Sequence, residues 1–324
     1  MNILLDPHIP FARGPLESTG ASIATDFTPE NIREADTIIC RTRARLNAET
    51  LAGSRVRLIA TATIGTDHID LDYCRRAGIT VANAPGCNAP AVGQWVTAAV
   101  EATRGCAGKT LGVIGVGNVG KVVARWGAGM GMKVLLNDPP RQEAGEPGFV
   151  PLDTIAAEAD VITVHTPLTK TGDHPTFHLI DSAFVAKCRR RPMILNTARG
   201  PVTETGALID GLRNGTLSAT GIDCWENEPD ISRELLGMSV IATPHIAGYS
   251  KEGKIRATQM ALDAFCRFYG LAPLRADAPA PAPVPDVITD PAYDIMADTR
   301  TLKTLPEEFE RLRNTYDLRP EPRR

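Results

Sequence analysis

The chain has 324 residues, of which 43% are hydrophobic and 23% are charged, and its formal net charge at pH 7 is −3. Such a composition is typical of a globular protein with a sizeable core, and the length favours two domains. The slightly acidic charge argues against nucleic acid as the main partner. Apolar runs are only strand-sized, and the N-terminus lacks the basic and apolar segments of a secretion signal. We therefore expect a cytoplasmic protein with no membrane partner.

Short β-branched runs alternate with helical stretches through the first 86 residues, which is the pattern of parallel βαβ units. The strands expected here are Asn2–Leu5, Thr37–Cys40, Leu58–Thr61 and Thr80–Ala82. A long helix is expected next, over Ala89–Thr103, because its apolar residues repeat at helical spacing.

A second βα series begins at Thr110. Its expected strands are Leu111–Ile114, Lys133–Asn137, Asp160–His165, Met193–Thr197, Ala219–Asp223 and Ser239–Ala242. Six strands with intervening helices predict a complete doubly wound nucleotide-binding domain. Another long helix is expected from Lys251 to Tyr269. Residues 272–291 are rich in Pro, Ala and Asp and predict an extended linker, followed by one helix over Pro306–Tyr316.

The segment 115–120, GVGNVG, matches G-x-G-x-x-G, follows an expected strand and opens a helical stretch. Such glycines permit a tight turn, a close approach to a pyrophosphate and close packing of helix on strand. Asp138 ends the next strand, and its carboxylate can accept hydrogen bonds from ribose hydroxyls and repel a 2′-phosphate. The pattern predicts NAD as cofactor, with a structural glycine turn as the alternative. The binding residues it indicates are Gly115, Gly117, Asn118, Val119, Gly120 and Asp138.

Arg199, Glu228 and His245 each follow one of three consecutive expected strands. Ligands of open α/β sheets lie beyond the carboxyl ends of the strands, so these side chains can converge. A histidine can exchange the hydroxyl proton of a secondary alcohol, and a carboxylate on its second nitrogen can fix the tautomer. A guanidinium can grip a substrate carboxylate. Each residue alone could be an ordinary surface or loop residue, but together they predict hydride transfer.

The segments that carry these residues are GVGNVG, HTPL (165–168), NTARGPV (196–202), GIDCWENEP (221–229) and TPHIAGYS (243–250). In these segments the chain resembles the D-isomer-specific 2-hydroxyacid dehydrogenase family, whose catalytic Arg, Glu and His would be Arg199, Glu228 and His245. The resemblance implies an α/β fold with two Rossmann-like doubly wound domains. These would be a flavodoxin-like substrate domain (1–88 and 250–271), an inserted NAD-binding domain (89–249) and a shortened C-terminal dimerisation-like region (272–324).

Within the family, LLDPHIPFAR (4–13), ATATIGTDHID (60–70) and PHIAGYSKEGK (244–254) are most similar to the members that oxidise 4-phospho-D-erythronate in pyridoxal phosphate biosynthesis. The resemblance thus implies a small phosphorylated 2-hydroxy acid as substrate, and a homodimer. It implies substrate contacts at Thr42, Thr63 and Tyr249, and further cofactor contacts at Thr166, Thr197, Ala198, Asp223 and Gly248. Glycerate, hydroxypyruvate, glyoxylate and 3-phosphoglycerate remain alternative substrates, and a non-enzymatic NAD-sensing scaffold is an alternative function.

Arg41, Arg43 and Arg45 alternate just after an expected strand, which would place their side chains on one face. They are interpreted either as a solvated basic strand end or as a phosphate site in which Arg41 and Arg45 bind.

The seven cysteines are odd in number, widely spaced and free of any C-x-x-C motif, so we expect reduced structural thiols. His174 and His178 are four residues apart but flank Pro175 and lack a third ligand, so no metal site is expected.

Overall fold

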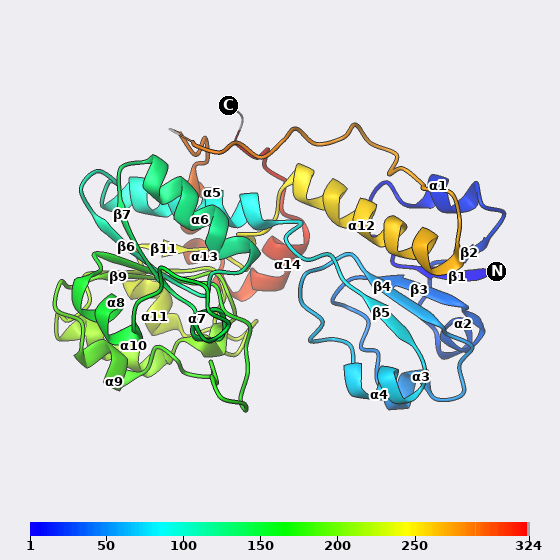
Figure 1. Cartoon of the computed structure of the whole chain (residues 1–324), viewed down its shortest axis with the longest axis horizontal. Helices are drawn as coiled ribbons and strands as arrows, with labels where there is room; N and C mark the ends of the chain where they lie inside the picture. Colours follow the sequence, from blue (N-terminus) through cyan, green and yellow to red (C-terminus); the bar gives the residue numbers. More distant parts are fainter. Residues whose placement is uncertain (289, 323–324) are drawn as a thin grey trace. The chain divides into compact units, whose positions relative to one another are not determined.

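The computed structural model describes residues 1–288 and 290–322. The chain divides into two compact units (Figure 1). Unit 1 consists of Met1–Asn88 and Ser250–Pro283, and unit 2 of Ala89–Tyr249 and Val284–Arg324. Unit 1 is therefore built from two separated stretches of the chain, and residues 89–249 of unit 2 are inserted between them in the sequence.

Unit 1 contains a five-stranded parallel sheet in the order β2-β1-β3-β4-β5. The strands are β1 Asn2–Leu5, β2 Ser22–Ala24, β3 Thr37–Cys40, β4 Leu58–Thr61 and β5 Thr80–Ala82. Both central strands, β3 and β4, are buried at every position, as parallel strands covered on both faces are. The order 2-1-3-4-5 is flavodoxin-like and confirms the expected fold of this unit.

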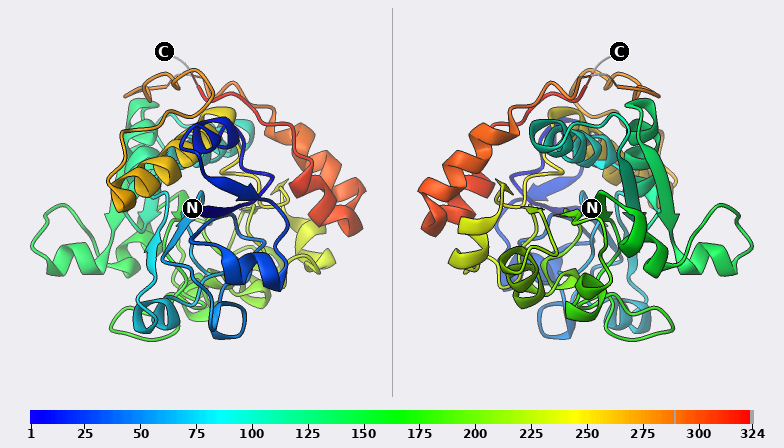
Figure 2. Two further views of the ribbon diagram at one scale, coloured as in Figure 1. Left: turned by 90° about the vertical axis from the view of Figure 1, so that its right-hand side faces the viewer. Right: turned by 90° about the vertical axis from the view of Figure 1, so that its left-hand side faces the viewer.

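Helices cover both faces of this sheet (Figure 2). On one face lie α1 Arg13–Glu17 and α12 Lys251–Tyr269, and on the other α2 Pro29–Glu34, α3 Ala48–Leu51 and α4 Leu71–Arg76. The bounds of α12 are those expected from sequence. Ser250 caps its N-terminus by accepting a hydrogen bond from Gly253 N, and Gly270 ends it in the left-handed conformation.

Unit 2 contains a six-stranded parallel sheet in the order β11-β10-β9-β8-β6-β7. The strands are β6 Thr110–Ile114, β7 Lys133–Asn137, β8 Val161–Val164, β9 Met193–Asn196, β10 Ala219–Ile222 and β11 Ile241–Ala242. All six expected strands are present, and the Rossmann-like fold is confirmed. The order reverses between β6 and β8, which makes the carboxyl ends of these strands a topological switch point.

Two helical layers enclose this second sheet (Figure 1). One contains α5 Ala89–Thr103 and α6 Asn118–Gly129, and the other α8 Leu152–Glu158, α9 Ser182–Ala186, α10 Thr205–Arg213 and α11 Arg233–Met238. Two shorter helices, α7 Pro139–Glu143 and the 3-10 helix η1 Gly200–Val202, follow β7 and β9.

The C-terminal residues pack on unit 2 as α13 Ile295–Thr304, the 3-10 helix η2 Pro306–Glu308 and α14 Phe309–Asn314. The expectation of a single helix after the linker is wrong, because α13 is also present. Its Thr299 hydroxyl accepts a hydrogen bond from Ala242 N at 3.2 Å, so α13 covers the edge of β11. The expected linker has neither helix nor strand at 272–288 and 290–291.

The seven cysteines are buried free thiols, as expected. Among the described residues, no helix combines the length and apolar character required to cross a membrane.

Candidate active site

The glycine-rich loop joins β6 to α6. Gly115 has φ +84°, and a Cβ there would lie 2.8 Å from the carbonyl carbon of His165. A Cβ on Gly120 would lie 2.1 Å from the Gly115 oxygen, so only glycine lets the helix pass this close to the turn. Gly117 has open space around its missing Cβ and leaves the helix without a side-chain cap. The N–H groups at the start of α6 are thus available to an anion such as a pyrophosphate.

The first turn of α6 begins with Asn118 and Val119, and Asp138 stands beside the loop at the end of β7. The Asp138 Oδ2 accepts a hydrogen bond from Val116 N at 2.8 Å, and Oδ1 accepts one from Arg141 N at 3.3 Å. The carboxylate is therefore fixed next to the loop, where ribose hydroxyls can reach its remaining lone pairs.

The residues that follow β8 and β9 add polar groups to the same sheet edge. Thr166 Oγ1 is buried and lacks a hydrogen-bond partner among the described residues. Burial lowers the pKa of His165 to about 3, so its ring is neutral, and it lies between Thr163 Oγ1 at 2.9 Å and Thr197 Oγ1 at 3.4 Å. Ala198 N donates to Asn196 Oδ1. An orphaned hydroxyl beside an uncapped helix fits the polar surface of a dinucleotide.

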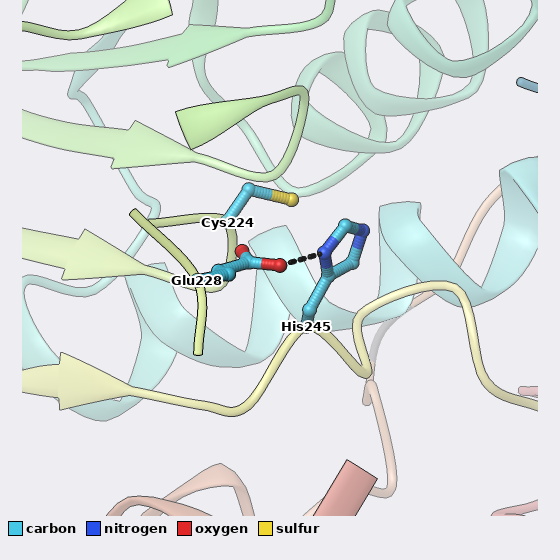
Figure 3. A group of neighbouring side chains, drawn as sticks. All are labelled: Cys224, Glu228 and His245. Atoms are coloured by element: carbon cyan, nitrogen blue, oxygen red, sulfur yellow. Dashed lines mark hydrogen bonds and ion pairs between the residues drawn. The ribbon is translucent and has the colours of Figure 1, made fainter. Parts of the chain in front are cut away.

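His245 and Glu228 form a hydrogen-bonded pair, with His245 Nδ1 2.8 Å from Glu228 Oε2 (Figure 3). Burial opposes the charge of Glu228, but His245, the Trp225 N–H and Arg313 hold the pKa of this carboxyl below its usual range. The carboxylate accepts from Nδ1–H, which leaves Nε2 of a neutral imidazole as the proton acceptor. The arrangement can remove a proton from a hydroxyl and stabilise the resulting imidazolium.

The turn that carries His245, residues 243–249, is held by the buried Asp223. Its Oδ1 accepts from Ile246 N at 2.8 Å and from Thr243 Oγ1 at 2.6 Å, and its Oδ2 accepts from Ala247 N at 3.0 Å. Asp223 thus positions the turn, which also contains Gly248 and ends at Tyr249. The resemblance implied a cofactor contact for Asp223 and not this role, for which its position at the end of an expected strand was the only signal in the sequence.

Arg199 follows β9 and caps the start of η1, and its Nη1 donates to Ala198 O at 2.8 Å. The next residue, Gly200, is pressed against the loop after β10, since a Cβ there would lie 1.8 Å from Trp225 O. The Arg199 charge acts on Cys224, whose side chain lies beside the His245–Glu228 pair (Figure 3). The three candidates Arg199, Glu228 and His245 therefore belong to one neighbourhood of unit 2.

Cys224, Glu228 and His245 also offer three potential metal ligands within 4.8 Å of one another (Figure 3). Burial, with Asp223 and Glu228 nearby, raises the pKa of the Cys224 thiol well above its usual value. Arg199 and Arg313 place positive charge on the same group. A divalent cation requires a deprotonated thiol and no competing cations, so the group suits proton handling better than metal binding.

The candidate substrate residues of unit 1 lie after β3 and β4. Thr63 Oγ1 donates to Gly65 O at 2.9 Å. Arg41 Nη1 donates to His8 O at 3.2 Å, and Arg43 Nη1 lies 3.5 Å from His8 Nε2. The extended alternation expected for the three arginines is replaced by a turn at 42–43, where Thr42 is exposed. Arg45 is also exposed.

One charged residue near the pair was not identified from sequence. Arg313 of α14 has its Nη1 3.9 Å from Glu228 Oε2. It lies in the helix expected after the linker, but no motif distinguishes it from the neighbouring Arg311.

Comparison with known proteins shows which family this chain is similar to. The family model of the D-isomer specific 2-hydroxyacid dehydrogenase NAD binding domain matches residues 88–247. The chain is 45% identical to erythronate-4-phosphate dehydrogenase of Bacteroides thetaiotaomicron, over 99% of this chain and 97% of the relative. It is 39% identical to the enzyme of the same name from Porphyromonas gingivalis, over 100% of this chain and 93% of the relative.

Solved structures of dehydrogenases have a similar fold. D-lactate dehydrogenase from Aquifex aeolicus, complexed with NAD and lactic acid, is 27% identical with a TM-score of 0.68, over 83% of this chain and 96% of that chain. NAD⁺-bound 3-phosphoglycerate dehydrogenase of Entamoeba histolytica is 28% identical with a TM-score of 0.71, over 83% and 95%. This chain therefore belongs to the D-isomer specific 2-hydroxyacid dehydrogenase family and is an NAD-dependent oxidoreductase.

Proposed function

We propose that this protein oxidises 4-phospho-D-erythronate at C2 to 2-oxo-3-hydroxy-4-phosphobutanoate, with NAD as the cofactor. The observation that carries the chemistry is the 2.8 Å contact of His245 Nδ1 with Glu228 Oε2, on the same sheet as a loop that fits NAD. The substrate is supported by the name of the relatives that are 45% and 39% identical over nearly the whole chain.

In this function His245 is the general base and acid. Its Nε2 takes the proton of the C2 hydroxyl during oxidation and returns it in the reverse direction. Glu228 orients the ring through Nδ1 and stabilises the imidazolium. Arg199 binds the substrate carboxylate, for which its planar guanidinium suits a bidentate contact.

The NAD would be held by the loop of Gly115, Gly117 and Gly120, by the N-terminus of α6 and by Asp138. Thr166, with its unpartnered hydroxyl, would supply a further contact. When bound, NAD supplies the acceptor for the hydrogen and electron pair that leave C2.

The substrate phosphate requires cationic donors of its own, and we assign Arg41 and Arg45 to it, with Thr42 and Thr63 beside them. Tyr249 would be a further substrate contact. We also infer that the protein acts in the cytoplasm, as expected from its N-terminal sequence and strand-sized apolar runs, and as a homodimer, as the family resemblance implies. Sedimentation at twice the mass of one 34.7 kDa chain would support the dimer, and sedimentation at the mass of one chain would contradict it.

The test is a panel of 2-hydroxy acids assayed for NADH formation. It contains 4-phospho-D-erythronate, D-erythronate, 3-phospho-D-glycerate and D-glycerate, and kcat/KM is compared across all four. We expect the highest value for 4-phospho-D-erythronate. A higher value for 3-phospho-D-glycerate would transfer the assignment to that shorter acid. Absence of turnover with every 2-hydroxy acid, with NAD binding intact, would favour a scaffold.

A further inference from the structure

Glu228 is approached by charged side chains from two sides. Its Oε2 contacts His245 Nδ1 at 2.8 Å, and the same oxygen lies 3.9 Å from Arg313 Nη1. The Glu228 and Arg313 side chains are only 18% and 20% exposed, so water screens their charges poorly. A single carboxylate oxygen is therefore shared between a histidine that changes its charge during the reaction and an arginine that does not.

Arg313 is held in this position by its own surroundings. Its side chain is hydrogen-bonded to Tyr249, which ends the turn that carries His245. Phe309, at the start of α14, is 1% exposed and packs in the same hydrophobic cluster as Trp225 and Leu235. The helix that carries Arg313 is thus part of the core of unit 2.

A second arginine fixes the segment beyond α14 to the turn of residues 243–249. Arg319 is 8% exposed, and its Nη1 donates to Ile246 O at 3.0 Å and to Tyr249 O at 3.1 Å. Its Nε donates to Gln94 Oε1 at 2.9 Å. The backbone on both sides of Arg313 is therefore tied to the elements that hold His245.

Charged or titratable groups face the pair from each neighbouring segment of unit 2. They are Asp223 and Cys224 after β10, Arg199 after β9, Tyr249 in the turn and Arg313 with Glu310 from α14. Arg199 has a separate task in the proposed function. Arg313 places a cation 3.9 Å from the carboxylate that is bonded to His245.

We propose that Arg313 is a positioning residue of the active site, which orients Glu228 and weakens the attraction of its carboxylate for a protonated His245. The proposal rests on the proposed role of His245 as the base in oxidation. The Arg313 guanidinium lies 3.9 Å from the Glu228 carboxylate, so its positive charge offsets part of the attraction that this carboxylate exerts on an imidazolium. Removing Arg313 removes that offset.

The test compares pH profiles of kcat/KM for oxidation, measured on the full-length protein with the best 2-hydroxy acid of the panel. In Arg313→Gln the acidic limb is expected to move to higher pH by about one unit, the low end of the effect of a nearby charge, because Arg313 acts through Glu228. Arg313→Lys keeps the charge and is expected to restore most of the original limb. Ionisation of the substrate phosphate contributes equally to the pH profile of every variant, because all variants are measured with the same substrate. A difference between variants therefore comes from the protein.

Arg311→Gln is the matched control, since Arg311 lies in the same helix, is 56% exposed and pairs with Glu308. It should leave the profile unchanged. An acidic limb in Arg313→Gln at the wild-type position, with only a lower plateau, would overturn the proposal and make Arg313 a packing residue. So would an Arg313→Lys variant with the same limb as Arg313→Gln.

If Arg313→Gln does not fold, the pH profile of Glu310→Gln tests the proposal instead. Glu310 Oε1 lies 3.6 Å from Arg313 Nη1 and is 50% exposed, so its loss strengthens the effective charge of Arg313 without disturbing the core. The acidic limb should then move to lower pH, and an unchanged or higher limb overturns the proposal. The substrate assignment is judged separately, because these shifts are measured with whichever 2-hydroxy acid the wild-type protein oxidises.

Discussion

The strand ends of the two units present functional candidates in very different ways. After β10 and β11 of unit 2, Glu228 and His245 are 18% and 26% exposed and bonded to each other, and Asp223 beneath them is buried. After β3 of unit 1, Arg43 and Arg45 are exposed, and the half-buried Arg41 donates to His8 O at 3.2 Å. The pair that we propose for proton transfer is thus held in place by hydrogen bonds between poorly exposed groups, whereas the arginines that we propose for the phosphate are held by few contacts and mostly face solvent.

The largest effect is expected in the preorganised region. His245→Ala should lower kcat by at least about 10²-fold, the low end for general acid–base catalysis. NAD affinity should be unchanged, because the proposed NAD contacts are made by the glycine loop and Asp138, whereas the His245 ring is bonded to Glu228. Steady-state turnover and NAD titration together test it. Loss of NAD binding, with turnover per bound NAD maintained, would remove His245 from the base role.

The buried Asp223 carboxylate holds the turn that carries His245. Asp223→Ala leaves three buried donors, Ile246 N, Ala247 N and Thr243 Oγ1, without their acceptor. We expect a free energy of unfolding lower by about 3 kcal/mol, because each unsatisfied buried group costs about 1–3 kcal/mol before relaxation. The exposed Asp210, replaced by Ala, serves as control and should stay within about 0.5 kcal/mol of wild type in urea unfolding. Equal effects of the two substitutions would show that the turn does not depend on Asp223.

In the exposed region the expected effect falls on substrate choice alone. Arg41→Ala and Arg45→Ala should each reduce the preference for 4-phospho-D-erythronate over D-erythronate by about 10- to 150-fold, the value of one charge-assisted hydrogen bond. The solvent exposure of Arg45 favours the lower end for that residue. The ratio of the two kcat/KM values measures this, with the exposed Arg33→Ala as control. A wild-type enzyme that treats the two acids equally would eliminate the phosphate site.

The smallest effect is expected at the cofactor. Asp138→Ser removes the charge that repels a 2′-phosphate and should raise NADP use relative to NAD by about tenfold, or about 1.4 kcal/mol. Comparing kcat/KM for the two cofactors in both proteins tests this. A wild-type protein that already prefers NADP would show that Asp138 does not select the cofactor.

Local sequence signals were sufficient where spacing and caps act within one element. The bounds of α5 and α12 agree with the residue pattern, since helical periodicity and the caps at Ser250 and Gly270 are local. β2 was not predicted, because it has three partly exposed residues at the sheet edge and carries no alternation of its own. The motif residues Arg199, Glu228 and His245 could be chosen from their positions after consecutive strands.

The residue pattern alone predicted every strand except β2, the helices α5 and α12, the glycine loop and the main candidate residues. Tertiary packing was needed to show that Ile295 and Leu302 are buried, which makes α13 a helix despite its threonine-rich sequence. It also decided that Asp223 holds the turn around His245 and that Arg313 reaches Glu228. These contacts join segments distant in the chain, and burial and charge pairing at such distances leave no periodic trace in the sequence.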